Sequence, residues 1–257
     1  IGYGSDGTAW GGEVMVANLR SFERVGGLMK QPMPGGDLAT QFPARMVAGM
    51  LWQALEPSEV EQILKEFCLS GFRHGEREIS VVLRQLERNL NIFWTSSCGR
   101  VLDAVACLLG ICSERTYEGE PAIKLEAAAD GGDPDRLRLK ALLNSVNGMN
   151  FVDTSHLLVD IIDALRTRVP RKHIAAAAQR AVAEGLAEIA IDAASARGMK
   201  VVGGSGGVFY NRAITAGVRG SVEKAGLKFV RHELLPPGDG GISVGQAVVA
   251  AYRASSG

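Results

Sequence analysis

The chain has 257 residues and a formal net charge of zero, with 28 basic and 28 acidic side chains. This balance argues against a general polyanion binder, so we expect no nucleic-acid partner. No run of about 18 apolar residues is present, and no membrane span is expected. The four cysteines, Cys68, Cys98, Cys107 and Cys112, show no metal-ligand spacing, which favours a reduced, cytoplasmic location.

Strands are expected to give way to helices along the first 112 residues. Alternating apolar residues predict half-buried strands at about 13–17 and 22–25. Apolar spacings of three and four then predict four helices, at about 46–55, 60–67, 77–89 and 97–111. The last of these follows Thr95, Ser96 and Ser97, which are helix-capping residue types. Trp52 and Trp94 are predicted to be core residues.

The rest of the chain is irregular at first and then alternates regularly. A short helix is expected at about 121–128, with strands at 136–143 and 148–153. Helices at about 171–197, 211–225 and 242–255 then alternate with strands at 200–202 and 228–230. Short links between such elements predict parallel strands that are covered by helices.

Two glycine-rich turns follow these last two strands. Gly206 and Gly207 lie in the first turn, before Asn211, and Asp239 lies in the second. Backbone amides in such turns bind anions, and ligands collect at the carboxyl ends of parallel strands. Asn211 would cap its helix or hydrogen-bond a ligand. Asp239 would bind a metal or cap the last helix, and the first turn would bind a nucleotide or nothing.

Two further candidate sites lie in the first half of the chain. Gly2, Gly4 and Gly7 belong to a glycine-rich hairpin that is able to wrap a phosphate. Asp103 lies one turn inside the helix that begins near residue 97, beside Arg100, where a carboxylate would suit a ribose diol. The alternative is an ordinary cap followed by an exposed Arg–Asp pair. Cys98 has no histidine near it in sequence, so we expect a buried or neutral thiol and not a nucleophile.

The order of these motifs resembles the Kae1-like domain of HypF-type hydrogenase-maturation carbamoyltransferases. The motif Trp10-Gly11-Gly12-Glu13 and the run Gly35-Gly36-Asp37 favour this branch over the related tRNA threonylcarbamoyl transferases. The matching stretches cover nearly the whole chain: residues 2–13, 22–25, 33–37, 95–106, 117–119, 206–212 and 236–241.

The resemblance implies a fold and a reaction. The fold would be an α/β lobe of the actin/hexokinase-like (ribonuclease-H-like) ATPase class, residues 1–257, with a helical insertion at about 43–112. A mixed sheet would combine the first strands with the C-terminal pair. In this family, carbamoyl phosphate and ATP give carbamoyl-adenylate. The carbamoyl group then passes to the C-terminal cysteine of a partner protein in nickel–iron hydrogenase maturation.

The resemblance also implies which residues bind. The nucleotide, ATP or carbamoyl-adenylate, would contact residues from all the glycine-rich segments: Gly2, Gly4, Gly7, Gly99, Asp103, Gly119, Glu120, Gly206, Gly207 and Asn211. Asp239 would be one ligand of a divalent metal, zinc, iron or magnesium. The family's histidine ligands are absent from this chain, and its other domains are missing as well. We therefore predict that the chain is the C-terminal lobe of a longer protein and cannot complete carbamoyl transfer alone.

Two other functions remain open on the sequence alone. One is a nucleotide-binding or partner-docking module without activity of its own, and the other is the ATP-binding lobe of a small-metabolite kinase. A kinase would release ADP, whereas the adenylate route releases AMP and diphosphate. In the enzyme hypothesis, the turns at Gly4, Gly119, Gly207 and Asp239 must converge on one edge of the fold.

Overall fold

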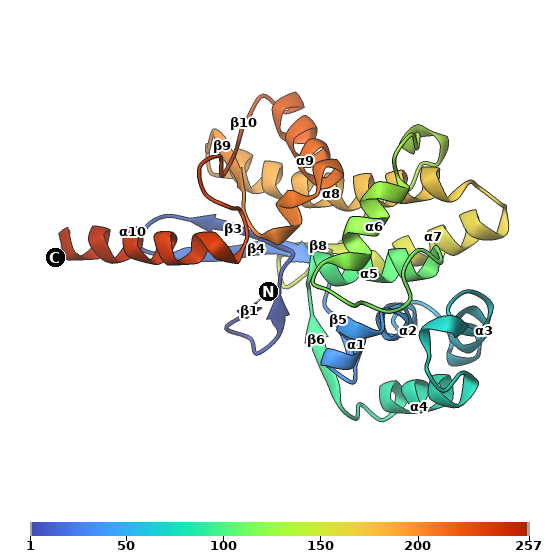
Figure 1. The fold of residues 1–257 in the computed structure, drawn as a ribbon. Helices are drawn as coiled ribbons and strands as arrows, with labels where there is room; N and C mark the ends of the chain where they lie inside the picture. The colour runs from blue at the N-terminus through green and yellow to red at the C-terminus, as the bar shows by residue number, and fades with distance from the viewer. Residues whose placement is uncertain (1, 256–257) are drawn as a thin grey trace.

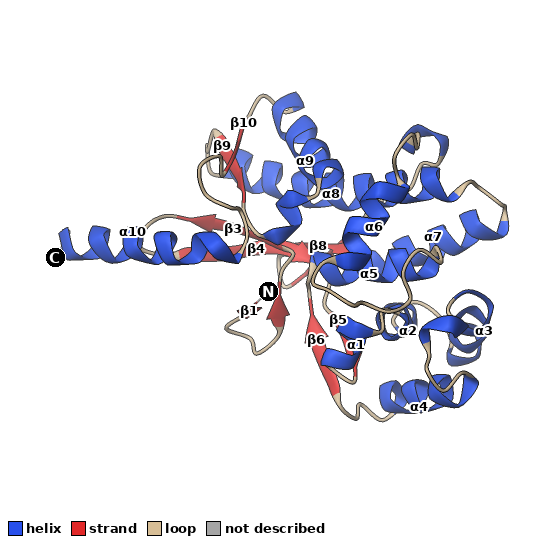
Figure 2. Ribbon diagram, viewed as in Figure 1, coloured by secondary structure: helices blue, strands red, loops and turns tan. Residues whose placement is uncertain are grey.

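The computed structural model describes residues 2–255, which fold into an α/β arrangement with three sheets (Figure 1). Figure 2 shows that helices make up most of the ribbon and that the strands lie mainly between them. Within residues 2–255, no helix is both long and apolar enough to span a membrane.

The N-terminal strands are divided between two four-stranded sheets. One sheet has the order β1 (Gly2–Tyr3), β2 (Ala9–Trp10), β6 (Ile92–Thr95), β5 (Gln31–Pro34). The other has the order β3 (Glu13–Ala17), β4 (Phe22–Leu28), β8 (Met149–Asp153), β7 (Leu142–Val146). The β3–β4 pair is antiparallel, with a register shift between Val14 and Met15, whereas β4 and β8 run parallel.

Four helices fill the region in which the sequence predicts a helical insertion. They are α2 (Ala44–Trp52), α3 (Pro57–Phe67), α4 (Glu76–Glu87) and α5 (Cys98–Leu108). Ser97 caps α5 by accepting a hydrogen bond from the Arg100 amide at 3.4 Å, as its residue type indicates. Strand β6 lies between α4 and α5, so this region is not purely helical. Trp94 in β6 is 40% exposed, so its assignment to the core was wrong.

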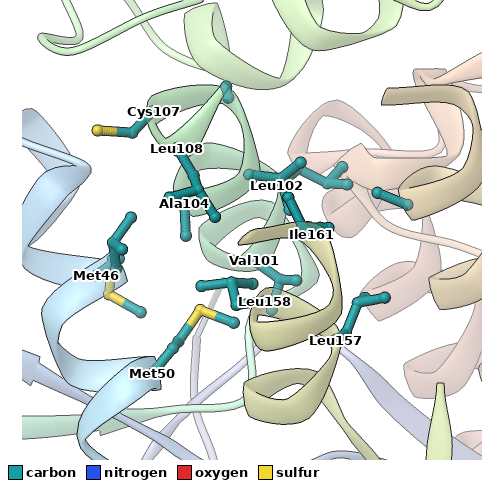
Figure 3. Close-up of a cluster of buried hydrophobic side chains, with 14 of the residues drawn as sticks. Met46, Met50, Val101, Leu102, Ala104, Cys107, Leu108, Leu157, Leu158 and Ile161 are labelled. Carbon is teal, nitrogen blue, oxygen red and sulfur yellow. The ribbon is translucent and has the colours of Figure 1, made fainter. Parts of the chain in front are cut away.

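The core lies where α2, α5 and α7 (Thr154–Arg166) meet. Figure 3 shows Met46 and Met50 of α2 facing Val101 of α5 and Leu158 of α7. All four side chains are at most 2% exposed. Burial of this kind contributes roughly 1.5–3 kcal/mol for each large apolar side chain.

The long helix α8 (Arg171–Ala196) joins the core to the C-terminal strands. Its small residues allow close packing on two sides. A Cβ atom at Gly185 would lie 2.9 Å from Val152 of β8, and one at Gly217 of α9 would lie 2.8 Å from Ala183. Beyond α8, β9 (Val201–Gly204), α9 (Arg212–Lys224) and β10 (Lys228–Arg231) form the predicted parallel unit.

The remaining helices are short, except for the last one. They are α1 (Asp37–Gln41), η1 (Leu69–Gly71), α6 (Glu120–Ala128), η2 (Pro134–Arg136), η3 (Gly207–Tyr210), η4 (Asp239–Gly241) and α10 (Ile242–Ser255). In Figure 1, α10 extends away from the rest of the ribbon toward the C-terminus.

Three details of the predicted fold need correction. Among residues 2–255, β9 and β10 pair only with each other and do not extend the N-terminal sheets, whose order is closed by β8 and β7 beside β4. The strand predicted at 136–143 begins only at Leu142, and Arg136 belongs to the 3-10 helix Pro134–Arg136. Helix α7 and strands β5 and β6 were not predicted from the sequence.

Candidate functional site

The two C-terminal glycine-rich turns lie against each other. The Gly206 amide donates a hydrogen bond to the Pro237 carbonyl at 2.6 Å, and a Cβ atom at Gly238 would lie 3.6 Å from the Gly207 Cα. Ser205 adds a second link, because its Oγ lies 3.1 Å from Nε2 of His232. In Figure 1 the loops after β9 and β10 come together below these strands. Parallel pairing thus places both turns at one sheet edge, as expected from the sequence.

The backbone of the first turn requires glycine at one position but not at the next. Gly206 has φ of 105°, a conformation that L side chains rarely adopt. Gly207 has no such constraint, and a Cβ atom there would meet no atom within 4 Å. Packing within this chain therefore leaves room at Gly207 for a ligand to approach the backbone.

Asn211 is buried, and both ends of its side-chain amide are hydrogen-bonded. Its Oδ1 accepts from the Ile214 amide at 2.9 Å, which caps α9, and its Nδ2 donates to Oε1 of Gln179 at 2.7 Å. The capping role predicted from the sequence is confirmed. Because Asn211 also joins α9 to α8, it sets the position of the glycine-rich turn relative to the core.

Asp103 forms the predicted pair with Arg100, but the pair is buried instead of exposed. Arg100 Nη2 lies 2.6 Å from Asp103 Oδ2, and the Asp103 side chain is 1% exposed. The contact is an ion pair by distance only, since neither Asp103 oxygen has a hydrogen-bond partner among residues 2–255. Burial raises the pKa of Asp103 to about 6, against the opposing effect of Arg100 and Arg115. Its carboxylate therefore has unused acceptor capacity, although a ligand reaches it only after neighbouring side chains move.

The turn that leads into α6 is closed by Glu120. Gly119 precedes it with φ of 77°. Oε2 of Glu120 accepts from the amide and the hydroxyl of Thr116, at 2.5 and 2.8 Å, and Oε1 lies 2.6 Å from Lys124 Nζ. Hydrogen bonds from Lys124 and Thr116 lower the pKa of Glu120 to about 2. Both carboxylate oxygens of Glu120 thus already serve to hold the turn.

The N-terminal hairpin is held together by Trp10 and Asp6. A Cβ atom at Gly4 would lie 2.0 Å from the Trp10 ring, so packing requires glycine there. Oδ1 of Asp6 accepts from Trp10 Nε1 at 2.9 Å and from the Thr8 hydroxyl at 2.7 Å. Burial opposes ionisation of Asp6, but hydrogen bonds from Lys30, Thr8 and Trp10 hold its pKa below the usual range. Around Gly2 and Gly7, a Cβ atom would meet nothing within 4 Å.

Glu13 connects this hairpin to the start of α5, a role that was not predicted from the sequence. Its Oε2 accepts from the amides of Gly11 and Gly12 at 2.6 and 2.9 Å. Its Oε1 accepts from Arg24 at 3.0 Å and from the Ser96 hydroxyl. A charged residue directly after two glycines is the only signal of this role in the sequence, and its partners come from distant segments.

The start of α5 offers no reactive thiol. Cys98 is fully buried, and burial raises the pKa of its thiol to about 12, with a further contribution from Asp103. The expected neutral thiol is confirmed. Gly99 lies next to it in α5, where a Cβ atom would make only an ordinary contact with Ser97 Oγ at 3.5 Å.

The residues present do not complete a metal site. Asp239 is exposed and begins η4, and η4 has no side-chain cap. Among residues 2–255, no group of three or more His, Cys, Asp or Glu side chains is arranged to hold a metal ion. A single carboxylate falls short of the coordination number that zinc, iron or magnesium takes.

Hydrogen bonds link three of the four predicted turns to one another, directly or through a helix. The Gly207 and Asp239 turns touch directly, and the Arg212 amide at the start of α9 donates to Oε1 of Glu126 in α6, the helix that follows Gly119, at 2.9 Å. The Gly4 hairpin instead contacts the start of α5, where the Cys98 amide donates to the Gly11 carbonyl at 3.1 Å. Among residues 2–255, no hydrogen bond joins the Gly4 and Gly207 turns, so their convergence stays a prediction.

Comparison with known proteins decides the family. Residues 1–246 match the family described as "Carbamoyltransferase, Kae1-like Domain, second subdomain". The chain belongs to this family. It is 39% identical over 248 residues to the probable carbamoyltransferase HypF of Methanocaldococcus jannaschii, covering 96% of this chain and 31% of that protein. The predicted resemblance is confirmed.

Solved structures of HypF proteins show the same fold. The crystal structure of T. kodakarensis HypF matches with a TM-score of 0.89 and 36% identity, over all of this chain and 33% of that one. A full-length HypF in the phosphate- and nucleotide-bound form matches with a TM-score of 0.84 and 29% identity, over 96% of this chain and 31% of that one. The predicted α/β fold class is thus confirmed, and the chain spans about a third of the length of these proteins.

Proposed function

We propose that this chain is the nucleotide-binding lobe of a carbamoyltransferase that acts in nickel–iron hydrogenase maturation. The paired glycine-rich turns at the end of β9 and β10 carry this proposal, because they lie against each other at the carboxyl ends of two parallel strands, where ligands collect. The longer protein would make carbamoyl-adenylate from carbamoyl phosphate and ATP. It would then transfer the carbamoyl group to a cysteine of a hydrogenase maturation protein.

The chain's own residues would bind and orient the adenylate. The backbone at Gly207 would face its phosphate, where fixed dipoles stabilise charge without reorganising, while the Gly206 amide stays bonded to the Pro237 carbonyl. The Asp103 carboxylate would accept hydrogen bonds from the ribose hydroxyls once uncovered. Asn211 would keep the turn in place through its bonds to α8 and α9.

Asp239 would contribute one ligand to a divalent metal, with the remaining ligands supplied from outside this chain. Such an ion would polarise an oxygen of the substrate when bound. Since the residues present do not form a metal site, the proposed role of this chain is nucleotide binding and does not depend on the metal.

Calorimetric titration of ATP and AMP into the chain tests the proposal. We expect Gly207→Val to weaken nucleotide binding at least tenfold, because its side chain would occupy the space beside the turn. Gly220→Val is the matched control. A Cβ atom at Gly220 also meets nothing within 4 Å, but Gly220 is an exposed position of α9, away from the turn. Equal affinity in both variants would refute the nucleotide site.

Product analysis tests the reaction class. The longer protein should release AMP and diphosphate in the presence of carbamoyl phosphate, and ADP would indicate a kinase. The isolated chain should show no carbamoyl transfer, because the adenylate-forming part lies outside it. Transfer by the chain alone would contradict this prediction.

A further inference from the structure

A cavity of about 640 Å³ opens between α1, α2 and the start of α4. Its volume is in the range of ligand-binding pockets. Leu38, Phe42 and Val81 form its apolar part, and Arg45, Arg73 and Arg77 bring positive charge to it. None of these residues is among those predicted to bind the nucleotide.

Arg45 is a fixed part of the cavity lining. It is only 8% exposed, and its Nη2 lies 2.5 Å from Oε1 of Glu78. Burial opposes ionisation of Glu78, but Arg45 and the His74 amide lower its pKa, so Glu78 is charged at neutral pH. Even so, Nε of Arg45 is buried and has no hydrogen-bond partner among residues 2–255. Arg45 therefore adds fixed positive charge to the lining, and a ligand reaches its Nε only after neighbouring side chains move.

The other two arginines leave the cavity positively charged. Arg73 stacks on the Phe42 ring at 4.4 Å and pairs with Glu114 at 2.9 Å, an exposed contact of small energetic value. Arg77 makes no ion pair within residues 2–255. The lining contains three arginines and one carboxylate, Glu78, while Glu114, which pairs with Arg73, lies outside the lining.

The apolar side chains of the cavity favour a peptide over a small anion as its ligand. Leu38 is 45% exposed and Val81 is 55% exposed, and both line the cavity with the arginines. A small inorganic anion would use the arginines and leave this apolar surface uncovered. A peptide in which an acidic residue adjoins an apolar one would use both.

We propose that this cavity docks an acidic, apolar peptide segment of a partner protein, with a carboxylate between Arg73 and Arg77 and an aliphatic side chain against Leu38 and Val81. The opposite charges of the cavity and the peptide select the partner. Arginine suits this role because its planar fork donates two hydrogen bonds to one carboxylate.

Fluorescence anisotropy with a labelled peptide of alternating leucine and glutamate tests the proposal on the 257-residue chain. We expect saturable binding that weakens with salt, and at least tenfold loss in the Arg73→Gln, Arg77→Gln double variant. The matched control removes two exposed arginines from the other end of the same helix, Arg84→Gln with Arg88→Gln, and should bind normally. Val81→Glu is a second test, for use if the double variant folds poorly. It changes an exposed position of the cavity lining and should also abolish binding.

Three results would overturn the proposal. If a peptide of alternating leucine and glutamine bound as tightly as the leucine–glutamate peptide, charge would play no part in binding. Complete displacement by inorganic phosphate at the peptide's own concentration would indicate a small-anion site. Binding to this chain, but not to the longer protein that contains it, would mean that another part of the same polypeptide fills the cavity.

Discussion

The helical core and α10 have similarly apolar sequences, yet they are buried to opposite extents. In α5 ten residues are buried, among them Val101, Leu102 and Val105. In α10 none is buried, and Ile242 and Val248 are 54% and 49% exposed. Both segments are helical, but only the helix that has another surface packed against it becomes part of the core. The core should carry most of the stability of this chain, and α10 should carry little.

The largest effect is expected from a substitution that creates a void in the core. Leu102→Ala should lower the free energy of unfolding by about 2–5 kcal/mol, because Leu102 is 1% exposed and its removal leaves a void. Urea denaturation followed by circular dichroism measures the change. A loss below about 1 kcal/mol would mean that the side chains around Leu102 in Figure 3 are loosely packed in solution.

The buried carboxylate of Asp103 in α5 should make the stability of the core depend on pH. The pKa of Asp103 is raised from 3.8 to about 6 in the folded chain, so its ionised form opposes folding above pH 6. This penalty disappears as pH falls through 6 toward 4. Relative to Asp103→Asn, whose side chain does not titrate, the wild-type chain should gain up to about 3 kcal/mol over that range. A difference between the two proteins that stays constant with pH would show that folding does not raise the pKa of Asp103.

Asn211 tests the junction between the core and the C-terminal unit. Asn211→Ala removes the α9 cap and the donor to Oε1 of Gln179, and should cost about 2 kcal/mol. Asn211→Ser keeps a capping oxygen and should cost less. Thermal unfolding of the two variants measures the order, and equal losses would assign the effect to the contact with Gln179 alone.

The smallest effect is expected in α10. Val248→Ala should change the free energy of unfolding by less than about 0.5 kcal/mol, because the side chain is 49% exposed. The same denaturation experiment provides the measurement. A loss as large as that of Leu102→Ala would show that α10 packs against the chain in solution.

Local signals predicted most of the helices and the C-terminal unit correctly. Apolar spacing located α2 to α5, and Ser97 and Asn211 cap helices as their residue types indicate. Strand β6 was missed because its four residues carry no clear alternation, and its pairing with β5 joins segments about 60 residues apart, at positions 31–34 and 92–95. Helix α7 directly follows a strand, so no loop marked its start.

For the site, the sequence by itself determined which residues are glycines, carboxylates and caps, and the family to which their order belongs. It also placed both C-terminal turns after parallel strands, because the intervening helix leaves the chain no other short route. Only the tertiary structure decided that Arg100 and Asp103 are buried, that Glu13 joins the hairpin to α5, and that three arginines line one cavity. Burial and long-range pairing depend on what packs against a residue, and its sequence neighbours do not carry that information.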